Sequence, residues 1–254
     1  MRLLRWILFA LLIAGVVSSS GCVYWRLLKL KNQLKDFSEN FEFLSDSHYS
    51  VSCLNPILSG DDIDRVMKVT PSELIRSQEQ TTSRVYSFLR IAPLAERVPL
   101  GGTEGLKFGW GEQPGRDLDY TLDFHEELFC GIHFPEEFNQ LFPAEALRNL
   151  LEGIGSADVD RSQSTLRTMT LRQQLRSLMP DKKQVETALG KPTARWIERK
   201  DRRERFLYLY EVKTESVKLP LHRRRAFGRF HFDEERLVQV DAAFAGRVFE
   251  FNIP

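Results

Sequence analysis

The run FHFDEERLVQV, residues 230–240, decides the fold. Strand-like residues lie on both sides of its acidic centre, a pattern typical of two antiparallel strands joined by a tight turn. The run LDFHEELF, residues 122–129, repeats this arrangement 108 residues earlier, with F-x-E-E at the same place in the turn. The matching positions are Leu122, Phe124, Glu126 and Glu127 in the first run and Phe230, Phe232, Glu234 and Glu235 in the second.

A second match lies upstream of each hairpin, at an offset of 122 residues. It covers a helix-like segment and the strand after it, and pairs Ile63, Asp64, Met67, Tyr86 and Phe88 with Val185, Glu186, Leu189, Tyr208 and Tyr210. The first half has the longer internal loop by 14 residues, which the glycine-rich stretch 93–116 supplies. These offsets indicate an internal duplication. Coincidence is the alternative, because any helix followed by strands shares apolar spacing.

We therefore predict an α+β protein made of two related units. Each unit is expected to be a helix or helix pair packed on a three-stranded antiparallel meander, because such a meander has one apolar face that a helix must cover. We expect strands at 41–44, 49–54, 84–91, 206–212, 227–232 and 237–244, and a hairpin at 119–134. We expect helices at 59–69, with Ser59 as N-cap, at 143–152, 165–179 and 180–189.

The chain divides, on this interpretation, into five segments. They are residues 1–21 as signal peptide, 22–40 as a membrane-proximal helix, 41–142 as the first unit, 143–164 as a connector helix and linker, and 165–254 as the second unit.

The N-terminus indicates export. Arg2 and Arg5 precede an apolar run from Trp6 to Val17, and small residues then lead to Cys22. Charged, apolar and small regions in this order are typical of a secretory signal, and the run is shorter than the about 20 residues of a membrane span. Small residues before a cysteine resemble the lipobox of bacterial lipoproteins, which implies that Cys22 is acylated. An uncleaved anchor is the alternative, and both place the bulk of the protein outside the cytoplasm.

Two further features bear on the membrane. Val23 follows Cys22 where an Asp would resemble the inner-membrane retention signal of enteric lipoproteins, so the outer membrane is favoured. The stretch 24–37, YWRLLKLKNQLKDF, has apolar residues at helical spacing with basic residues between them. Such a helix either rests on an anionic leaflet or packs its apolar stripe on the domain behind it.

Two cysteines remain after Cys22. Cys53 and Cys130 are able to form a disulfide in an oxidising periplasm, if the geometry permits. The alternative is two separate buried thiols, because sequence does not give the distance between them.

Composition and motifs exclude several functional classes. The 254 residues carry 36 basic and 35 acidic side chains, which leaves no electrostatic footprint for nucleic acid. With 42% apolar and 28% charged residues, neither a multi-span membrane protein nor a disordered chain is expected. The chain lacks the G-x-S-x-G, P-loop, G-x-G-x-x-G and H-E-x-x-H motifs. We expect no cofactor and no metal.

The second unit resembles a known family. The run DKKQVETALGKPT at 181–193, YLY at 208–210 and the hairpin run at 230–240 are similar to the BamE-like (SmpA/OmlA) bacterial lipoproteins over roughly residues 165–244. The resemblance implies two helices packed on a three-stranded antiparallel sheet. It also implies a non-catalytic role in outer-membrane protein assembly or envelope integrity, through protein and lipid contacts.

Two clusters are candidates for chemistry or contact. His125, Glu126 and Glu127, with His133 further on, have the composition of a metal site, but a solvated hairpin turn explains them equally. Arg223, Arg224 and Arg225 are able to meet anionic lipid headgroups or an acidic partner, and a solvated loop is the alternative.

We therefore expect a membrane-tethered periplasmic binding or assembly module, without catalytic activity, that contacts membrane lipid through its anchor and an envelope protein as its partner. The rival hypothesis is a periplasmic hydrolase that uses the acidic hairpin around His125.

Overall fold

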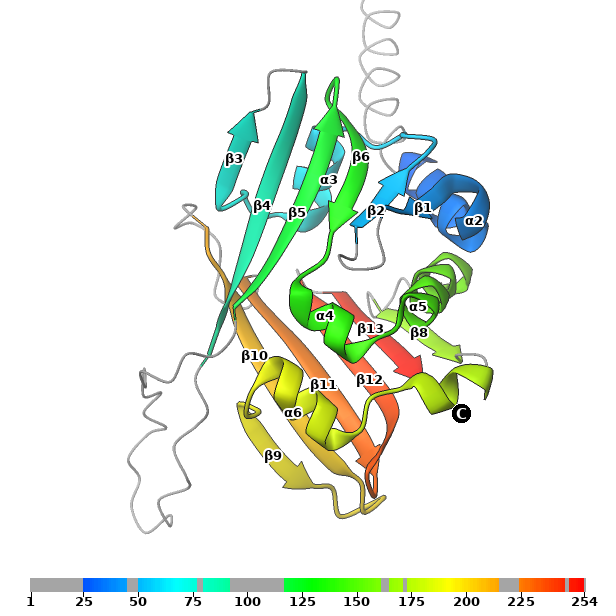
Figure 1. Ribbon diagram of the computed structural model, residues 1–254, viewed down its shortest axis with the longest axis vertical. Helices are drawn as coiled ribbons and strands as arrows, with labels where there is room; N and C mark the ends of the chain where they lie inside the picture. The colour runs from blue at the N-terminus through cyan, green and yellow to red at the C-terminus, as the bar shows by residue number, and fades with distance from the viewer. Residues whose placement is uncertain are drawn as a thin grey trace, which may run out of the picture.

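The fold is α+β, as the sequence predicts, and its strands form one continuous sheet (Figure 1). In this computed structural model, thirteen strands belong to that sheet, and among the described residues every strand pair is antiparallel except β13 with β8. The structure describes residues 25–44, 50–76, 80–91, 117–160, 165–170, 173–214, 224–244 and 247–253.

Eleven strands follow one path across the sheet, and two short strands pair to its sides. In spatial order the path is β1 (Phe41–Phe43), β2 (Ser50–Cys53), β6 (Leu128–His133), β5 (Leu118–His125), β4 (Thr81–Arg90), β10 (Glu204–Val212), β11 (Arg225–Asp233), β12 (Arg236–Phe244), β13 (Arg247–Asn252), β8 (Thr165–Thr170) and β7 (Asp158–Asp160). The side strands are β3 (Glu73–Arg76) on β4 and β9 (Ala194–Ile197) on β10. The helices are residues 25–35, α2 (Phe37–Asn40), α3 (Gly60–Met67), α4 (Glu136–Leu141), α5 (Ala144–Ser156), the 3₁₀ helix η1 (Gln173–Leu178) and α6 (Lys182–Leu189).

The same sequence of elements occurs twice. The first half consists of α3 and β3–β6, and the second half of α6 and β9–β12. Gly60 and Lys182 begin the two helices, 122 residues apart. Ser59 and Asp181 cap them, and both caps are complete capping boxes in which side chain and backbone bond reciprocally. The predicted helices at 59–69 and 180–189 and both predicted hairpins are therefore confirmed.

Strand register repeats as well. Tyr86 of β4 lies opposite Tyr120 of β5, and at the equivalent positions Tyr208 of β10 lies opposite Gly228 of β11. The halves thus share the register of β4 with β5 and of β10 with β11.

The halves meet where β4 pairs with β10. Phe88 lies opposite Val212 and Arg90 lies opposite Tyr210. Tyr210 and Val212 stand 122 residues after Phe88 and Arg90, so each strand presents equivalent positions to the other. A local two-fold relation therefore links the two halves across this junction.

The expected three-stranded meander is too small, because each half has four consecutive antiparallel strands. The extra strands β3 and β9 follow Pro71 and Pro192, which end the preceding segments. All four residues of β3 are exposed, and its adjacent apolar residues Leu74 and Ile75 do not give the apolar–polar alternation that marks a half-buried strand. Backbone hydrogen bonding to the neighbouring strand holds these short segments.

The expected helix at 165–179 is wrong. Strand β8 occupies 165–170, pairs in parallel with β13, and is followed by η1. Three of its six residues are threonines, which favour strands, and this outweighs the helical spacing of Leu166 and Met169. The predicted loop at 93–116 lies outside the described residues.

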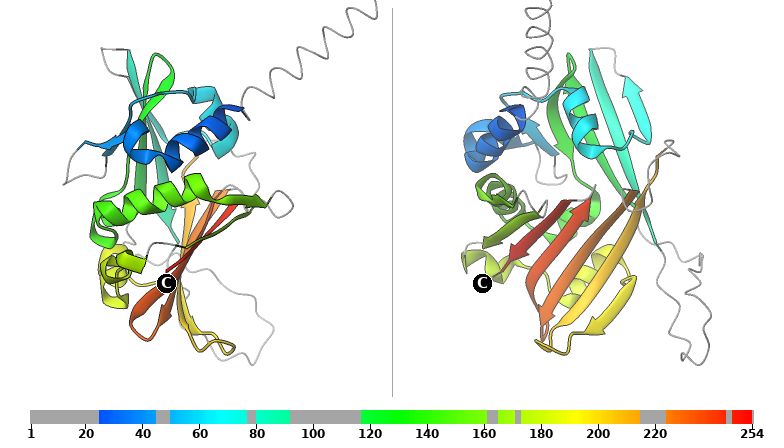
Figure 2. Two further views of the ribbon diagram at one scale, coloured as in Figure 1. Left: turned by 90° about the vertical axis from the view of Figure 1, so that its right-hand side faces the viewer. Right: turned by 180° about the vertical axis from the view of Figure 1, so that it is seen from behind.

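Helix α5 is longer than predicted and passes through Gly153 to Ser156. A side chain at Gly155 would meet the backbone of Lys35 at 2.2 Å, so this glycine lets α5 pack closely on the helix at 25–35. Figure 2 shows α5 lying across the middle of the molecule, between the two halves.

The N-terminal helix packs on the domain. Leu27 and Leu30 contact the main core, and Leu30 and Leu34 contact a second cluster around Phe37. The structure therefore supports the packing interpretation of the stretch 24–37.

Candidate functional site

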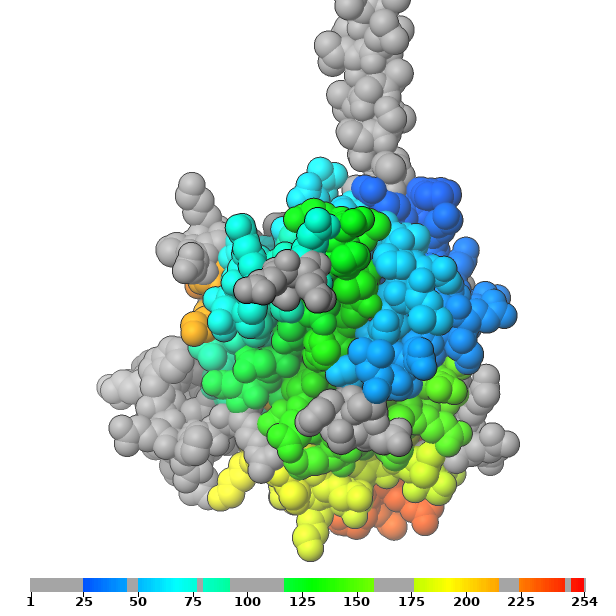
Figure 3. Space-filling model, turned by 45° about the horizontal axis from the view of Figure 1, so that its top comes forward, coloured from blue at the N-terminus to red at the C-terminus, as the bar shows by residue number. Residues whose placement is uncertain are grey.

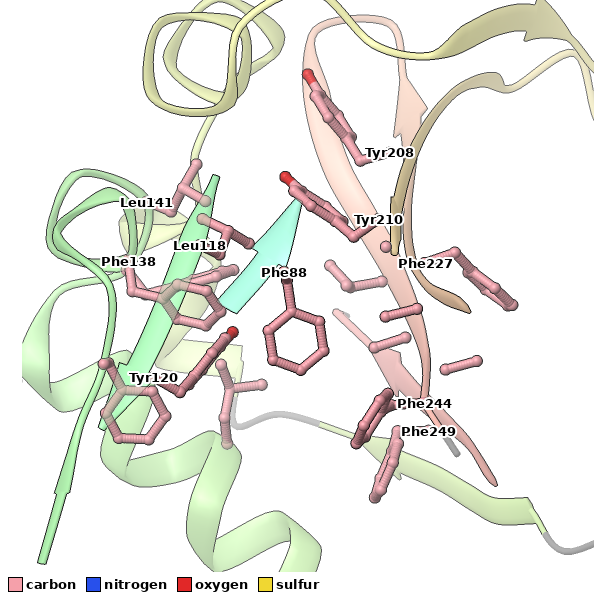
Figure 4. A pocket seen from close by; sticks show the side chains of 18 of the residues that line it. Phe88, Leu118, Tyr120, Phe138, Leu141, Tyr208, Tyr210, Phe227, Phe244 and Phe249 are labelled. Carbon is pink, nitrogen blue, oxygen red and sulfur yellow. The ribbon is translucent and has the colours of Figure 1, made fainter. Parts of the chain in front are cut away.

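An apolar cavity lies where the inner faces of the two halves meet (Figure 4). Its volume is about 470 Å³, within the range of about 300–1,000 Å³ found for small-molecule sites. Strands of both halves and helices α4 and α5 form its wall, and almost all the exposed lining surface is carbon. Lining side chains include Phe88, Tyr120, Phe138, Tyr210, Phe244 and Phe249.

The cavity exists because the two halves differ in the size of their inner side chains. The first half presents Leu118, Tyr120 and Phe134 to it, whereas the equivalent positions of the second half, 108 residues later, are Ala226, Gly228 and Ala242. The register confirms the first two equivalences, because Phe88 lies opposite Leu118 as Tyr210 lies opposite Ala226, and Tyr86 opposite Tyr120 as Tyr208 opposite Gly228. The small side chains of the second half therefore leave the space.

One end of the cavity carries polar groups. Arg90 lies over the rings of Tyr208 and Tyr210, with its guanidinium carbon 4.3 and 5.1 Å from the two ring centroids. The Tyr208 hydroxyl donates to the carbonyl of Gly190 at 3.0 Å. Burial raises the pKa of both phenols and lowers the pKa of Arg90. At neutral pH the tyrosines are neutral donors and the arginine is still a cation.

A chain of hydrogen bonds crosses strands β2, β6, β5 and β4 in the first half. Ser50 Oγ lies 2.6 Å from His133 Nδ1, His133 Nε2 lies 2.5 Å from Asp123 Oδ2, and Ser83 Oγ donates to Asp123 Oδ1 at 2.6 Å. Figure 3 shows β5 and β6, in green, between the light-blue β2 segment and the cyan β3–β4 segment.

The connectivity from serine to histidine to aspartate is that of a nucleophile, its base and an orienting acid. Burial acts to raise the pKa of Asp123, but hydrogen bonds from His133 and Ser83 outweigh it and lower that pKa. The hydrogen bond to Asp123 raises the pKa of His133 against the opposing effect of burial. Ser50 is only 7% exposed, which restricts the access of a substrate to its hydroxyl.

The second half carries the same pair with its partners exchanged. His231 and Asp241 lie 108 residues after Asp123 and His133, and His231 Nε2 is 2.8 Å from Asp241 Oδ2. A β-bulge directly follows Asp123 in one hairpin and His231 in the other. Both His231 and Asp241 are buried, at 4% and 7% exposure. A buried hydrogen-bonded pair at an equivalent place indicates that these cross-strand contacts hold the hairpins together.

The acidic turn itself does not form a site. His125 and His133 stand at opposite ends of the β5–β6 hairpin, so the structure does not bring them together. Glu126 and Glu127 both have positive φ and form the exposed turn. Within the described part of the chain, no cluster of His, Cys, Asp and Glu has the geometry for a metal ion.

Cys53 and Cys130 lie on the adjacent strands β2 and β6. The last paired residues are Ser52 and Gly131, and the cysteines are the next residues along each strand. Both are free thiols, and burial raises the pKa of each, which keeps them protonated. The disulfide is not formed in this structure, and its formation in the periplasm stays a prediction.

The basic cluster is only partly described. Arg223 lies outside the described residues, whereas Arg224 Nη1 is 3.7 Å from Glu211 Oε1, and Arg225 lies opposite Glu211 in the sheet. Glu211 therefore offsets part of the positive charge expected there.

The expected signal peptide and the expected lipidation site Cys22 also lie outside the described residues, so both stay predictions. The described helices include none with the length and apolar content of a membrane span. Trp25 and Leu28, in the first turn of the helix at 25–35, are exposed apolar side chains, at 57% and 43% exposure.

No protein-family model matches the chain, and no curated protein or solved structure matches it at a significant level. The resemblance of residues 165–244 to BamE-like lipoproteins therefore stays a prediction.

The cavity, Arg90 and Ser50 were not expected from the sequence. The signal for the cavity is present in the repeat, because alignment at 108 residues places Ala226 and Gly228 against Leu118 and Tyr120. No such signal exists for Ser50, since its hydrogen bond with His133 depends on the pairing of β2 with β6.

Proposed function

We propose that this protein is a membrane-tethered, non-catalytic binding module of the bacterial envelope, and that the cavity between its halves is the ligand site. One observation carries the proposal. Both halves contribute to a cavity of about 470 Å³ with almost entirely carbon lining. Each CH₂ group that leaves water for such a lining gains about 0.8 kcal/mol, so an alkyl chain is the class of ligand it favours.

The two halves are, in this proposal, products of a duplication, as two related helix-plus-meander units. Their helices, caps and strand registers correspond position by position. The second unit then replaced large inner side chains by small ones at positions 226, 228 and 242. A structural repeat would in this way have become a binding site.

The location follows from the N-terminus. A signal followed by Cys22 supports lipidation and export, with the protein facing the periplasm and the outer membrane favoured over the inner one. Exposed Trp25 and Leu28 directly after the anchor are suited to the membrane interface. A role in outer-membrane protein assembly or envelope integrity, with an envelope protein as partner, fits this location.

The test uses the residues of the first half to fill the cavity. Ala226→Leu with Ala242→Phe introduces the side chains found at the equivalent positions 118 and 134. The full chain in phospholipid nanodiscs is irradiated with a long-chain alcohol that carries a photoreactive diazirine. We expect labelling of peptides that line the cavity, and a loss of about tenfold or more in the double variant.

Ala194→Leu is the matched control, because Ala194 lies on the side strand β9 and is not part of the cavity lining. It adds the same group as Ala226→Leu and should label as the wild type does. Equal labelling of the wild type and the double variant would reject the cavity as the site.

A hydrolase is the second candidate, and the bonds joining Ser50, His133 and Asp123 favour it. Ser50→Ala separates the two functions. If the protein is a hydrolase, this variant loses turnover of ester substrates and keeps alkyl-probe labelling. If the protein is a binding module, the wild type shows no turnover that Ser50→Ala removes.

A further inference from the structure

Arg90 lies beside one end of the cavity, against the rings of Tyr208 and Tyr210, which belong to the lining while Arg90 itself does not. On β4 the side chains of Tyr86 and Phe88 face inward, and Arg90 is the next residue in that alternation. It lies opposite Tyr210, which is 5% exposed and lines the cavity. A cation therefore stands beside an apolar site.

The polar atoms at this end are incompletely satisfied. Arg90 Nη2 donates to the carbonyl of Lys191 at 2.7 Å. Arg90 Nη1 and Tyr210 Oη have no hydrogen bond of good geometry, although the guanidinium lies close enough to the Tyr210 hydroxyl to interact with it and to act against the rise in its pKa that burial causes. The carboxylate of Asp117 accepts from the backbone N–H of Arg90 at 2.7 Å. Among the described residues, no carboxylate lies within ion-pair distance of the Arg90 guanidinium.

Other arginines of the sheet differ in this respect. Arg84 pairs with Asp64 at 2.9 Å, and Arg205 with Glu198 at 3.0 Å. Arg90 is half-buried and has no carboxylate counter-ion among the described residues, so Arg90 and the Tyr210 hydroxyl are suited to an anion supplied by a ligand.

The polar end has no equivalent in the other half. The two-fold relation exchanges Arg90 with Val212 and Tyr210 with Phe88. At the end of the cavity that is away from Tyr210, the lining includes Phe244 and Phe249 (Figure 4). The site therefore has one polar end and one apolar end, which fits a molecule with one head and one chain.

We propose, building on the proposed function, that the ligand is a long-chain monocarboxylate. Its carboxylate accepts hydrogen bonds from Arg90 Nη1 and Tyr210 Oη, and its alkyl chain extends toward Phe244 and Phe249. One guanidinium edge and one hydroxyl match the two oxygens and the single charge of a carboxylate.

The test compares two photoreactive probes on the full chain in nanodiscs: a long-chain fatty acid with a diazirine in its chain, and the alcohol of the same length. We expect the wild type to favour the acid by about tenfold or more, and Arg90→Met to abolish that preference while the alcohol labels as before. Tyr210→Phe should weaken labelling by the acid more than labelling by the alcohol. Arg205→Met, which removes a cation from the neighbouring strand, should keep the preference.

The outcomes separate the two proposals. If the wild type labels equally with both probes inside the cavity, or if Arg90→Met keeps the preference for the acid, the carboxylate proposal is wrong and the binding function stands. If neither probe labels the cavity, the proposed function itself fails. Circular dichroism of each variant shows whether the fold is intact.

Discussion

The two halves of this protein share a backbone plan and differ in what they present to the interior. Their helices begin 122 residues apart with the same type of cap, and their hairpins have the same register and the same bulge. At three equivalent inner positions, however, the first half has Leu118, Tyr120 and Phe134, and the second half has Ala226, Gly228 and Ala242. The comparison teaches that two halves with the same central strand register leave a cavity where one half has smaller inner side chains than the other.

The same comparison separates structural from chemical roles. A serine–histidine–aspartate chain in isolation suggests catalysis, but its His–Asp contact recurs at the equivalent positions with the residues exchanged. A contact that tolerates this exchange serves the hairpin. Arg90, in contrast, has no counterpart, because the equivalent residue of the second half is Val212.

The largest expected effect contrasts Leu118 with Ala226. Leu118→Ala removes a buried side chain next to an existing cavity, so the free energy of unfolding should fall by about 2–5 kcal/mol. Ala226→Leu adds that side chain where space exists, and should be neutral or stabilising by about 1 kcal/mol. Urea denaturation of both variants measures the difference, and equal losses would contradict the assignment of the cavity to the second half.

The second-largest effect contrasts the two His–Asp pairs in how much each contributes to the free energy of unfolding. Asp241→Ala leaves the buried His231 and Gln239 without their acceptor, and should lower the free energy of unfolding by about 3 kcal/mol. Asp123→Ala acts on a more exposed pair and should lower it by about 1 kcal/mol. Denaturation of the two variants side by side checks the order, and a larger loss for Asp123→Ala would reverse it.

The helix caps should be equivalent. Ser59→Ala and Asp181→Ala each remove the side-chain acceptor of a capping box, and each should lower the free energy of unfolding by about 1 kcal/mol. Similar values support the correspondence of the halves. A loss confined to one variant would show that the caps do not have the same role.

The smallest effect is a pH dependence in the first half. Because its pKa is raised in the folded state, His133 contributes stability that is fully present below its unfolded value of about 6.5 and is lost as pH rises through the raised value. His133→Gln should therefore differ from the wild type most in mildly acidic solution and least in alkaline solution.

For Asp241 the dependence of stability on pH has the opposite sign. Burial acts to raise the pKa of Asp241, but hydrogen bonds from His231 and Gln239 lower it overall. Its contribution is present above about pH 4 and is lost as pH falls through the lowered value. Melting temperatures across this range, for His133→Gln and Asp241→Asn, check both signs. A His133→Gln difference that grows in alkali would contradict the assignment.

Much of the fold could be predicted from sequence, because its strongest elements carry local signals. The F-x-E-E turns, the cap at Ser59 and the alternating strands were all expected, and all are present. The exposed strand β3 was missed because it is short and lacks alternating burial, although it pairs with the next strand, β4. The threonine-rich strand β8 was missed because it pairs with β13, which is distant in the sequence. Helix α5 continues through two glycines because the helix at 25–35 packs on Gly155.

The candidate site was less accessible to prediction. Arg90 and Tyr210 meet only through the register of β4 with β10, and no local pattern contains that pairing. The small residues at 226, 228 and 242 were visible in the repeat, but they create a cavity only because all three lie on the same inner face of the sheet. The expected site around His125 is an exposed turn instead.

Native mass spectrometry of the full chain, extracted gently from its own membrane, tests the central claim most directly. Wild-type protein should retain one long-chain compound per chain, held without a covalent bond and therefore distinct from any acyl group at Cys22. The Ala226→Leu, Ala242→Phe double variant should lose that compound and keep its circular dichroism spectrum. A wild type that carries no such compound, or a folded double variant that carries as much of it, would contradict the account.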